Sequence, residues 1–145
     1  MSTASPATKD LARRLLAFEA EHDNAPEARV HVAAQVIDQL RTHLIRLAGV
    51  VGFRSLLSRA LTLAKSEVPL LNMVRVGADG SLEGLEGIAQ SQEAGADEQA
   101  GLVLVAHLLD LLVTFIGQPL TLRLVIDAWP DASIDGADLR TEEKP

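Results

Sequence analysis

The chain has no cysteine and no tyrosine, and only 3% of its 145 residues are aromatic. The absence of cysteine excludes disulfides, cysteine-ligated zinc, iron–sulfur clusters and thiol catalysis. So few aromatic side chains also argue against stacking on single-stranded nucleic acid. Because 48% of the chain is hydrophobic, Leu, Val, Ile and Ala must build the interior. Such an interior suits helices packed on helices, and the length is that of one domain.

A membrane span and an export signal are not expected. The longest apolar run, roughly residues 100–116, contains His107 and Asp110 and is shorter than the roughly 20 residues that cross a bilayer. We therefore expect a buried core helix and no membrane association. The first ten residues lack the charged and then apolar pattern of a secretory signal, which predicts a cytoplasmic protein.

The charge is negative and unevenly distributed. The net charge of −7 makes nucleic acid and anionic membranes unlikely partners in general. Residues 1–76 hold ten Lys and Arg against seven Asp and Glu, whereas residues 77–145 hold three against thirteen. The favoured interpretation is that the acidic half is solvated loop and tail. The alternative is attraction between the halves, within one chain or between two subunits.

Helical periodicity predicts a mainly all-α fold, a compact bundle of five or six helices around the central apolar helix. The predicted helices span residues 7–21, 26 to about 49, 53–67, 100–116 and 119–129, with a weak helix within 84–99. A minor β-hairpin near residues 73–83, pairing 74–76 with 81–83, is compatible with the turn residues between them, although it would be marginal without helices to pack on.

The second helix carries the clearest apolar pattern. Its stripe alternates steps of three and four, as at the a and d positions of a bundle helix, and comprises Val30, Ala33, Ile37, Leu40, Leu44, Leu47 and Val51. Gly49 and Gly52 interrupt the helix near its end and predict a bend or junction there. We expect a tail over residues 1–8, one helical domain over 9–131 with a mobile acidic loop at 77–99, and an acidic tail over 132–145.

A weak internal similarity relates residues 43–64 to residues 110–128. Both segments read as an apolar helix, a glycine and a short helix. Placing Arg59 opposite Arg123 requires an insertion, because these arginines lie at different distances from Gly49 and Gly117. A duplicated helical hairpin and chance similarity of two Leu-rich stretches both explain this pattern.

The segment around His43 resembles the motif of histidine phosphotransfer domains, which are helical bundles that expose one histidine. His43 is followed by Arg46 and Gly49, although bulky residues occupy intervening positions where the motif has small ones. The resemblance implies that His43 carries the phosphoryl group and that Arg46 counters its charge. The alternative is a histidine at the edge of the core. Similarly, Glu19 and His22 supply only half of a di-iron pattern, so His22 is read as a helix-end residue.

His107, Asp110 and Thr114 form the only polar stripe on the central helix. A buried Asp110 would need a partner, and Arg54, Arg59 and Arg123 are the candidates. One hypothesis is a binding or interface site formed by the stripe together with Arg59 and Arg123. The favoured interpretation is that the stripe is the solvent-facing edge of the helix.

No motif predicts an enzyme, a cofactor or a metal site. A phosphate-binding loop, a nucleophile elbow, a zinc-binding His-Glu-x-x-His and a calcium loop are all missing. We therefore expect a non-enzymatic helical interaction module, an adaptor, regulator or assembly subunit, that binds a protein partner or forms a homodimer. The alternatives are phosphotransfer through His43 and a small nucleic-acid-binding regulator. A helix-turn-helix at 44–64 would offer only Arg54 and Arg59 as basic contacts.

Overall fold

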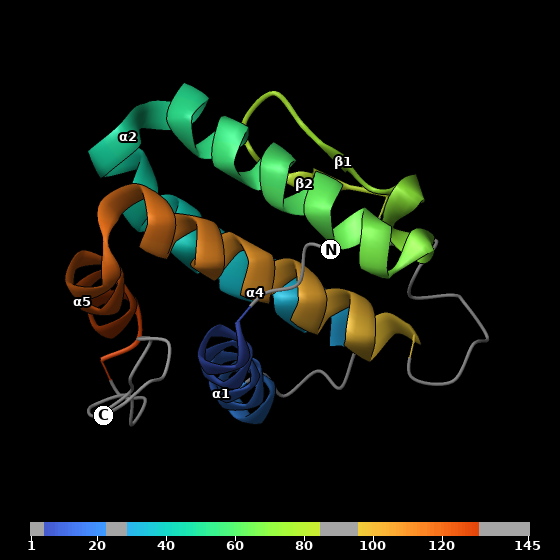
Figure 1. Cartoon of the computed structure of the whole chain (residues 1–145), viewed down its shortest axis with the longest axis horizontal. Coiled ribbons are helices and arrows are strands. Elements are labelled where there is room, and N and C mark those ends of the chain that lie inside the picture. The colour runs from blue at the N-terminus through green and yellow to red at the C-terminus, as the bar shows by residue number, and fades with distance from the viewer. Residues whose placement is uncertain (1–4, 23–28, 85–95, 131–145) are drawn as a thin grey trace.

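The computed structural model describes residues 5–22, 29–84 and 96–130, and this part of the chain is mostly helical (Figure 1). The elements in chain order are α1 (Pro6–His22), α2 (Arg29–Glu67), the 3-10 helix η1 (Pro69–Met73), β1 (Arg75–Val76), β2 (Leu82–Glu83), α4 (Ala96–Ile116) and α5 (Gln118–Ala128). The expected count of five or six helices is not confirmed, because the described residues contain four α-helices. The weak helix and most of the loop expected before α4 lie outside the described residues.

Helix α1 begins earlier than expected because its first turn is capped. The Ser5 hydroxyl accepts a hydrogen bond from the Thr8 backbone N–H at 3.2 Å, and Pro6 occupies the first helical position. Thr8 is buried. The boundary expected after residue 8 is therefore corrected, since residues 5–8 belong to the folded part; the tails expected at 1–4 and 132–145 lie outside the described residues.

The second and third predicted helices are two segments of α2 that meet at Gly49. This residue has φ 78° and ψ 169°, inside an otherwise helical run. The expected junction is confirmed at Gly49 but not at Gly52, which is helical. Gly117 has nearly the same conformation, φ 92° and ψ 158°, and separates α4 from α5. Both glycines lie in a region of backbone space that is essentially closed to other residues.

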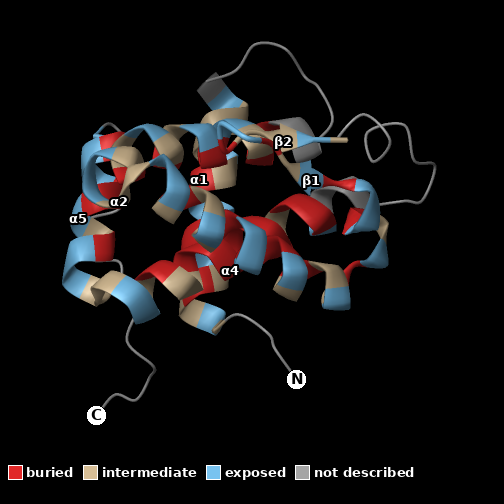
Figure 2. Cartoon of the chain, turned by 90° about the horizontal axis from the view of Figure 1, so that it is seen from above, coloured by how far each residue is buried: buried red, intermediate tan, exposed pale blue. Residues whose placement is uncertain are grey.

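Helix α4 is the centre of the fold, as expected from its composition. It contacts α1, α2, α5 and η1. Its buried residues form a nearly continuous band that Figure 2 shows in red at the middle of the molecule. Two helical stretches, Val32–Glu67 and Gln99–Ile116, are long and apolar enough by length and composition to cross a membrane. The shares of their apolar windows that are buried within the protein are 28% and 56%, and a core helix passes the same test of length and composition.

The predicted hairpin is present but short. Strands β1 and β2 pair antiparallel, with Arg75 opposite Glu83 and Val76 opposite Leu82. Val74 is buried just before β1, and the side chains of Val76 and Leu82 pack on the core. These contacts with the helices support a strand pair that would be marginal alone. Residues 77–83, expected in a mobile loop, therefore belong to the hairpin.

The internal similarity becomes much clearer in the structure. When Gly49 is placed on Gly117 without any gap, burial agrees along most of both segments (residues 32–62 and 100–130). We call these segments repeat 1 and repeat 2. Identical residues occupy five aligned positions, at Leu40/Leu108, Leu44/Leu112, Gly49/Gly117, Leu56/Leu124 and Ala60/Ala128. The insertion required by matching Arg59 with Arg123 is wrong, since Arg59 aligns with Asp127.

Candidate functional site: the corner surface

The exposed large hydrophobic side chains gather at the two glycine bends. Five of the seven such side chains in the described residues lie within three positions of Gly49 or Gly117. They are Leu47 (57% exposed), Val50 (41%), Val51 (72%), Phe115 (65%) and Leu120 (44%). We call these five side chains the corner surface. Concentrations of exposed apolar side chains are characteristic of interaction sites, whereas single ones are common everywhere.

Both bends lie at the same end of the molecule. The first half of α2 runs behind α4 in the same direction, and α2 turns back close to where α4 leads into α5 (Figure 1). Leu47 and Phe115 stand two positions before their glycines, and Val51 and Pro119 stand two positions after them; all four are exposed. The corner surface therefore consists of two equivalent corners, one from each repeat.

The corner surface continues the apolar stripe of α2. The stripe residues Ala33, Ile37, Leu40 and Leu44 are buried, whereas Leu47 and Val51 are exposed; the side chain of Val30 lies outside the described residues. The last two positions of the predicted stripe are therefore not covered within the chain. The reason is the bend at Gly49, which turns the chain back before these side chains are covered.

The corners carry almost no charge. Segments 46–51 and 114–120 contain a single charged residue, Arg46, which is exposed. Its equivalent in repeat 2 is Thr114, also exposed. An apolar surface with so little charge resembles the centre of a protein–protein interface, where charged residues are depleted.

The polar stripe on α4 is divided among three environments. His107 is buried, and its Nε2 atom lies 2.5 Å from Oε2 of Glu67. Asp110 is half-buried and accepts a hydrogen bond from the Thr8 hydroxyl at 3.1 Å. Thr114 is exposed and donates to the backbone carbonyl of Asp110. The expected solvent-facing edge is therefore wrong for His107, because the end of α2 supplies an acceptor within the core.

The three arginines considered as partners of Asp110 lie away from that carboxylate. Arg54 donates to the carbonyl of Gly77 at 3.2 Å, and Arg123 lies 3.7 Å from Asp127 on the surface of α5. Arg59 is exposed. Among the described residues no ion pair joins any of these arginines to Asp110, whose partner is Thr8. The structure therefore does not bring Arg59 and Arg123 together with the α4 stripe.

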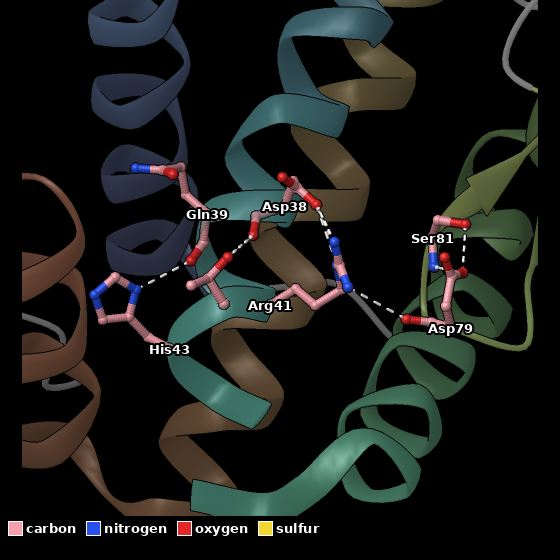
Figure 3. Close-up of polar contacts among 7 residues, drawn as sticks. Asp38, Gln39, Arg41, His43, Asp79 and Ser81 are labelled. Atoms are coloured by element: carbon pink, nitrogen blue, oxygen red, sulfur yellow. Dashed lines mark hydrogen bonds and ion pairs between the residues drawn. The ribbon is translucent and has the colours of Figure 1, made fainter. Parts of the chain in front are cut away.

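His43 lies at the edge of the core, half-buried on the first half of α2 (Figure 3). Its Nδ1 atom lies 3.2 Å from the backbone carbonyl of Gln39, so Nδ1 carries the proton of this hydrogen bond. In the neutral ring, Nε2 then keeps the lone pair. Arg46 is exposed one turn further along the same helix. The side chain of His22 lies outside the described residues.

A concave region away from the corner surface lies between α1, the first half of α2 and the hairpin. It is a cleft of about 690 Å³. Several of its polar groups are used within the chain: Glu19 accepts from the Trp129 indole, and Arg41 contacts Asp38 at 2.7 Å and the carbonyl of Asp79 at 3.5 Å (Figure 3). Hydrogen bonds from Ser81 hold the pKa of Asp79 below its usual value. Within the described residues, no group of three or more His, Asp or Glu could hold a metal ion.

No family model, curated protein or solved structure matches the chain. The sequence pattern indicates the two glycines and the residues Leu47 and Val51, but not Val50, Phe115 or Leu120. The signal for these three is position, because each lies within three residues of Gly49 or of its equivalent Gly117. The function is therefore inferred from the corner surface.

Proposed function

We propose that this protein is a non-enzymatic helical interaction module that self-associates through the corner surface. The observation that carries the proposal is the apolar stripe of α2, which is buried as far as Leu44 and then exposed at Leu47 and Val51. Within the chain α2 packs mainly against α4, the equivalent helix of repeat 2. A second copy offers its own exposed corner side chains to the uncovered end of the stripe.

The expected strength is modest. Full burial of one Leu, Val or Phe side chain contributes about 1.5–3 kcal/mol, and the five corner side chains are already partly covered. Association costs roughly 4–15 kcal/mol in lost translational and rotational freedom. Because these quantities are of similar size, we expect a reversible dimer whose population depends on protein concentration.

Sedimentation velocity and light scattering over a concentration series test the proposal. The wild-type protein should form dimers as concentration rises, and the variant Leu47→Ser/Phe115→Ser should remain monomeric. The matched control is Met73→Ser/Ile126→Ser, which makes the same kind of change at the two exposed hydrophobic residues away from the glycines. A wild-type protein that stays monomeric throughout, or a corner variant that dimerises like the control, would contradict the proposal.

The wider role as adaptor, regulator or assembly subunit in the cytoplasm belongs to this proposal. The lack of cysteine supports a reducing compartment. The low charge of the corners also suits an apolar protein surface better than a phosphate backbone. Nucleic-acid binding stays an alternative, and it predicts a mobility shift that weakens steeply with salt.

Phosphotransfer through His43 is the second candidate function, and one observation favours it. The hydrogen bond from Nδ1 to the Gln39 carbonyl orients the ring and leaves Nε2 as the nucleophilic nitrogen. In the proposed step, Nε2 attacks the phosphorus of a partner's phosphoaspartate or phosphohistidine, and the partner side chain leaves as the phosphorus–nitrogen bond forms. Arg46 would counter the phosphoryl charge.

This candidate predicts an acid-labile phosphoryl label on the wild-type protein. The label should disappear in His43→Gln and persist in His31→Gln, which changes another histidine of the same helix. Label that survives in His43→Gln would exclude the candidate. Its failure would leave the self-association proposal intact, because the two rest on different residues.

A further inference from the structure

One pair of equivalent positions, Gln39 and His107, makes contacts to distant helix ends. Gln39 in repeat 1 and His107 in repeat 2 are aligned when Gly49 is placed on Gly117. Gln39 donates to the carbonyl of Ala128 at 3.2 Å, near the end of α5. His107 bonds Glu67 at the end of α2. Each first helix thus reaches the end of the helix that follows the other bend, although the two acceptors are not aligned, because Ala128 is equivalent to Ala60 and Glu67 lies beyond repeat 1.

This relationship extends to the corner surface. The two first helices run in the same direction, so an axis that exchanges them passes through the end of the molecule between the two bends (Figure 1). Exposure agrees across the pairs Leu47/Phe115, Val51/Pro119 and Arg46/Thr114. The exposed positions of the two corners therefore correspond in part, whereas Val50 aligns with Gln118 and Leu120 with Gly52.

Resting on the self-association proposed above, we propose that two copies dock end to end, with the repeat 1 corner of one copy against the repeat 2 corner of the other. A symmetric dimer of such a surface has two simple arrangements. In one, like corners meet; in the other, unlike corners meet. Both bury the same apolar side chains, so the distinction must come from which side chains face one another.

Arg46 makes this distinction. If like corners meet, Arg46 of one copy approaches the partner's Arg46, and like charges brought together at an interface are unfavourable. If unlike corners meet, Arg46 approaches the partner's Thr114, which carries no charge. The nearest charged residue before Thr114 on α4 is the half-buried Asp110, which is bonded to Thr8, so no like charge faces Arg46 from that helix. Charge therefore favours unlike corners.

Side-chain size points to the same arrangement. The repeat 1 corner exposes the branched aliphatic side chains Leu47 and Val51, whereas the repeat 2 corner exposes the rings of Phe115 and Pro119. When unlike corners meet, an aliphatic residue of one copy faces a ring of the other at each of the two contacts. Like pairing would instead crowd two Phe115 rings at one contact and leave the smaller side chains to fill the other.

Cysteine cross-linking tests the arrangement cleanly, because the wild-type chain has no cysteine. Chains carrying Leu47→Cys and chains carrying Phe115→Cys are mixed at a concentration where the wild type is dimeric and then treated with a short bis-maleimide. The mixture should cross-link several-fold more than either variant alone. Ser58→Cys, exposed on the second half of α2, is the matched control and should cross-link weakly.

Equal or greater cross-linking within Leu47→Cys alone would overturn the arrangement. Arg46→Ala gives a second test that leaves the apolar side chains unchanged. It should leave the dimer dissociation constant unchanged or raise it several-fold, and tighter dimerisation would indicate that the two Arg46 side chains repel each other. In both cases the wild type would still dimerise, whereas a monomeric wild type would refute the proposed function itself.

Discussion

The imidazole of His107 and the carboxylate of Glu67 lie 2.5 Å apart and join the middle of α4 to the last residue of α2. The His107 side chain is 3% exposed and that of Glu67 is 19% exposed. A buried polar group without a partner is costly, so each residue explains why the other is tolerated in an aliphatic core. The pair fixes the second half of α2 against the central helix.

Removal of the acceptor should destabilise the fold. Glu67→Ala leaves the buried imidazole without its partner, and we expect the free energy of unfolding to fall by about 1–3 kcal/mol. Urea denaturation measures this loss. In a double-mutant cycle with His107→Leu, Glu67→Ala should cost much less, because no buried donor then remains. Equal costs in both backgrounds would mean that the two side chains do not stabilise each other.

Substitution of the bend glycines should destabilise through the backbone alone. A Cβ atom at Gly49 would meet nothing within 4 Å, and at Gly117 the nearest atom is Cδ of Pro119 at 3.9 Å. The conformations themselves are unfavourable for alanine, so Gly49→Ala and Gly117→Ala should each cost about 1–3 kcal/mol. Ser58→Ala, at an exposed helical site, is the control for thermal denaturation. Unchanged stability of both glycine variants would show that the bends tolerate other conformations.

The capped start of α1 is tied to α4 through Thr8. Its hydroxyl lies 2.6 Å from that of Ser5 and donates to the Asp110 carboxylate. Thr8→Val keeps the side-chain shape but removes this link, and a bond to a charged acceptor contributes roughly 1.5–3 kcal/mol. Thr114→Val is the matched control, because its hydroxyl is exposed and bonds only its own helix. Chemical denaturation should separate the two variants, and equal effects would argue against the link.

The pKa of Asp79 provides a pH-dependent test of the hairpin turn. The Ser81 hydroxyl, at 2.7 Å, and the Ser81 backbone N–H, at 3.0 Å, hold this pKa below its ordinary value of 3.8. The turn is therefore stabilised by the ionised carboxylate above pH 3.8, and this contribution is lost as the pH falls through the lower folded-state pKa. Ser81→Ala should raise the pKa of Asp79 towards 3.8 in an NMR titration. Ser66→Ala should leave it unchanged.

Much of the fold could be predicted because its helices follow local rules. The apolar composition of residues 100–116 was sufficient to identify the core helix, and the turn residues at 78–81 were sufficient for the hairpin. Helix ends at Pro and Gly were also close to those observed. Such features depend on short-range periodicity and backbone preference, which a single sequence displays directly.

The contacts between distant residues could not be predicted in the same way. Periodicity places Leu47 and Val51 on the buried stripe of α2, and only the direction taken after Gly49 exposes them. Likewise, the pairing of Asp110 with Thr8 depends on where α1 crosses α4. The Arg-to-Arg alignment concealed the repeat because those side chains are on the surface, where sequence is least constrained by packing.

Trp129 is the only tryptophan in the chain, and its Nε1 donates to Oε2 of Glu19 at 2.7 Å. It is buried directly after α5, while Glu19 belongs to α1. Intrinsic fluorescence therefore reports from one place, the contact between the first and last helices. Separation of these helices would expose the indole and shift its emission to longer wavelength, so the protein carries its own optical probe for opening of the domain.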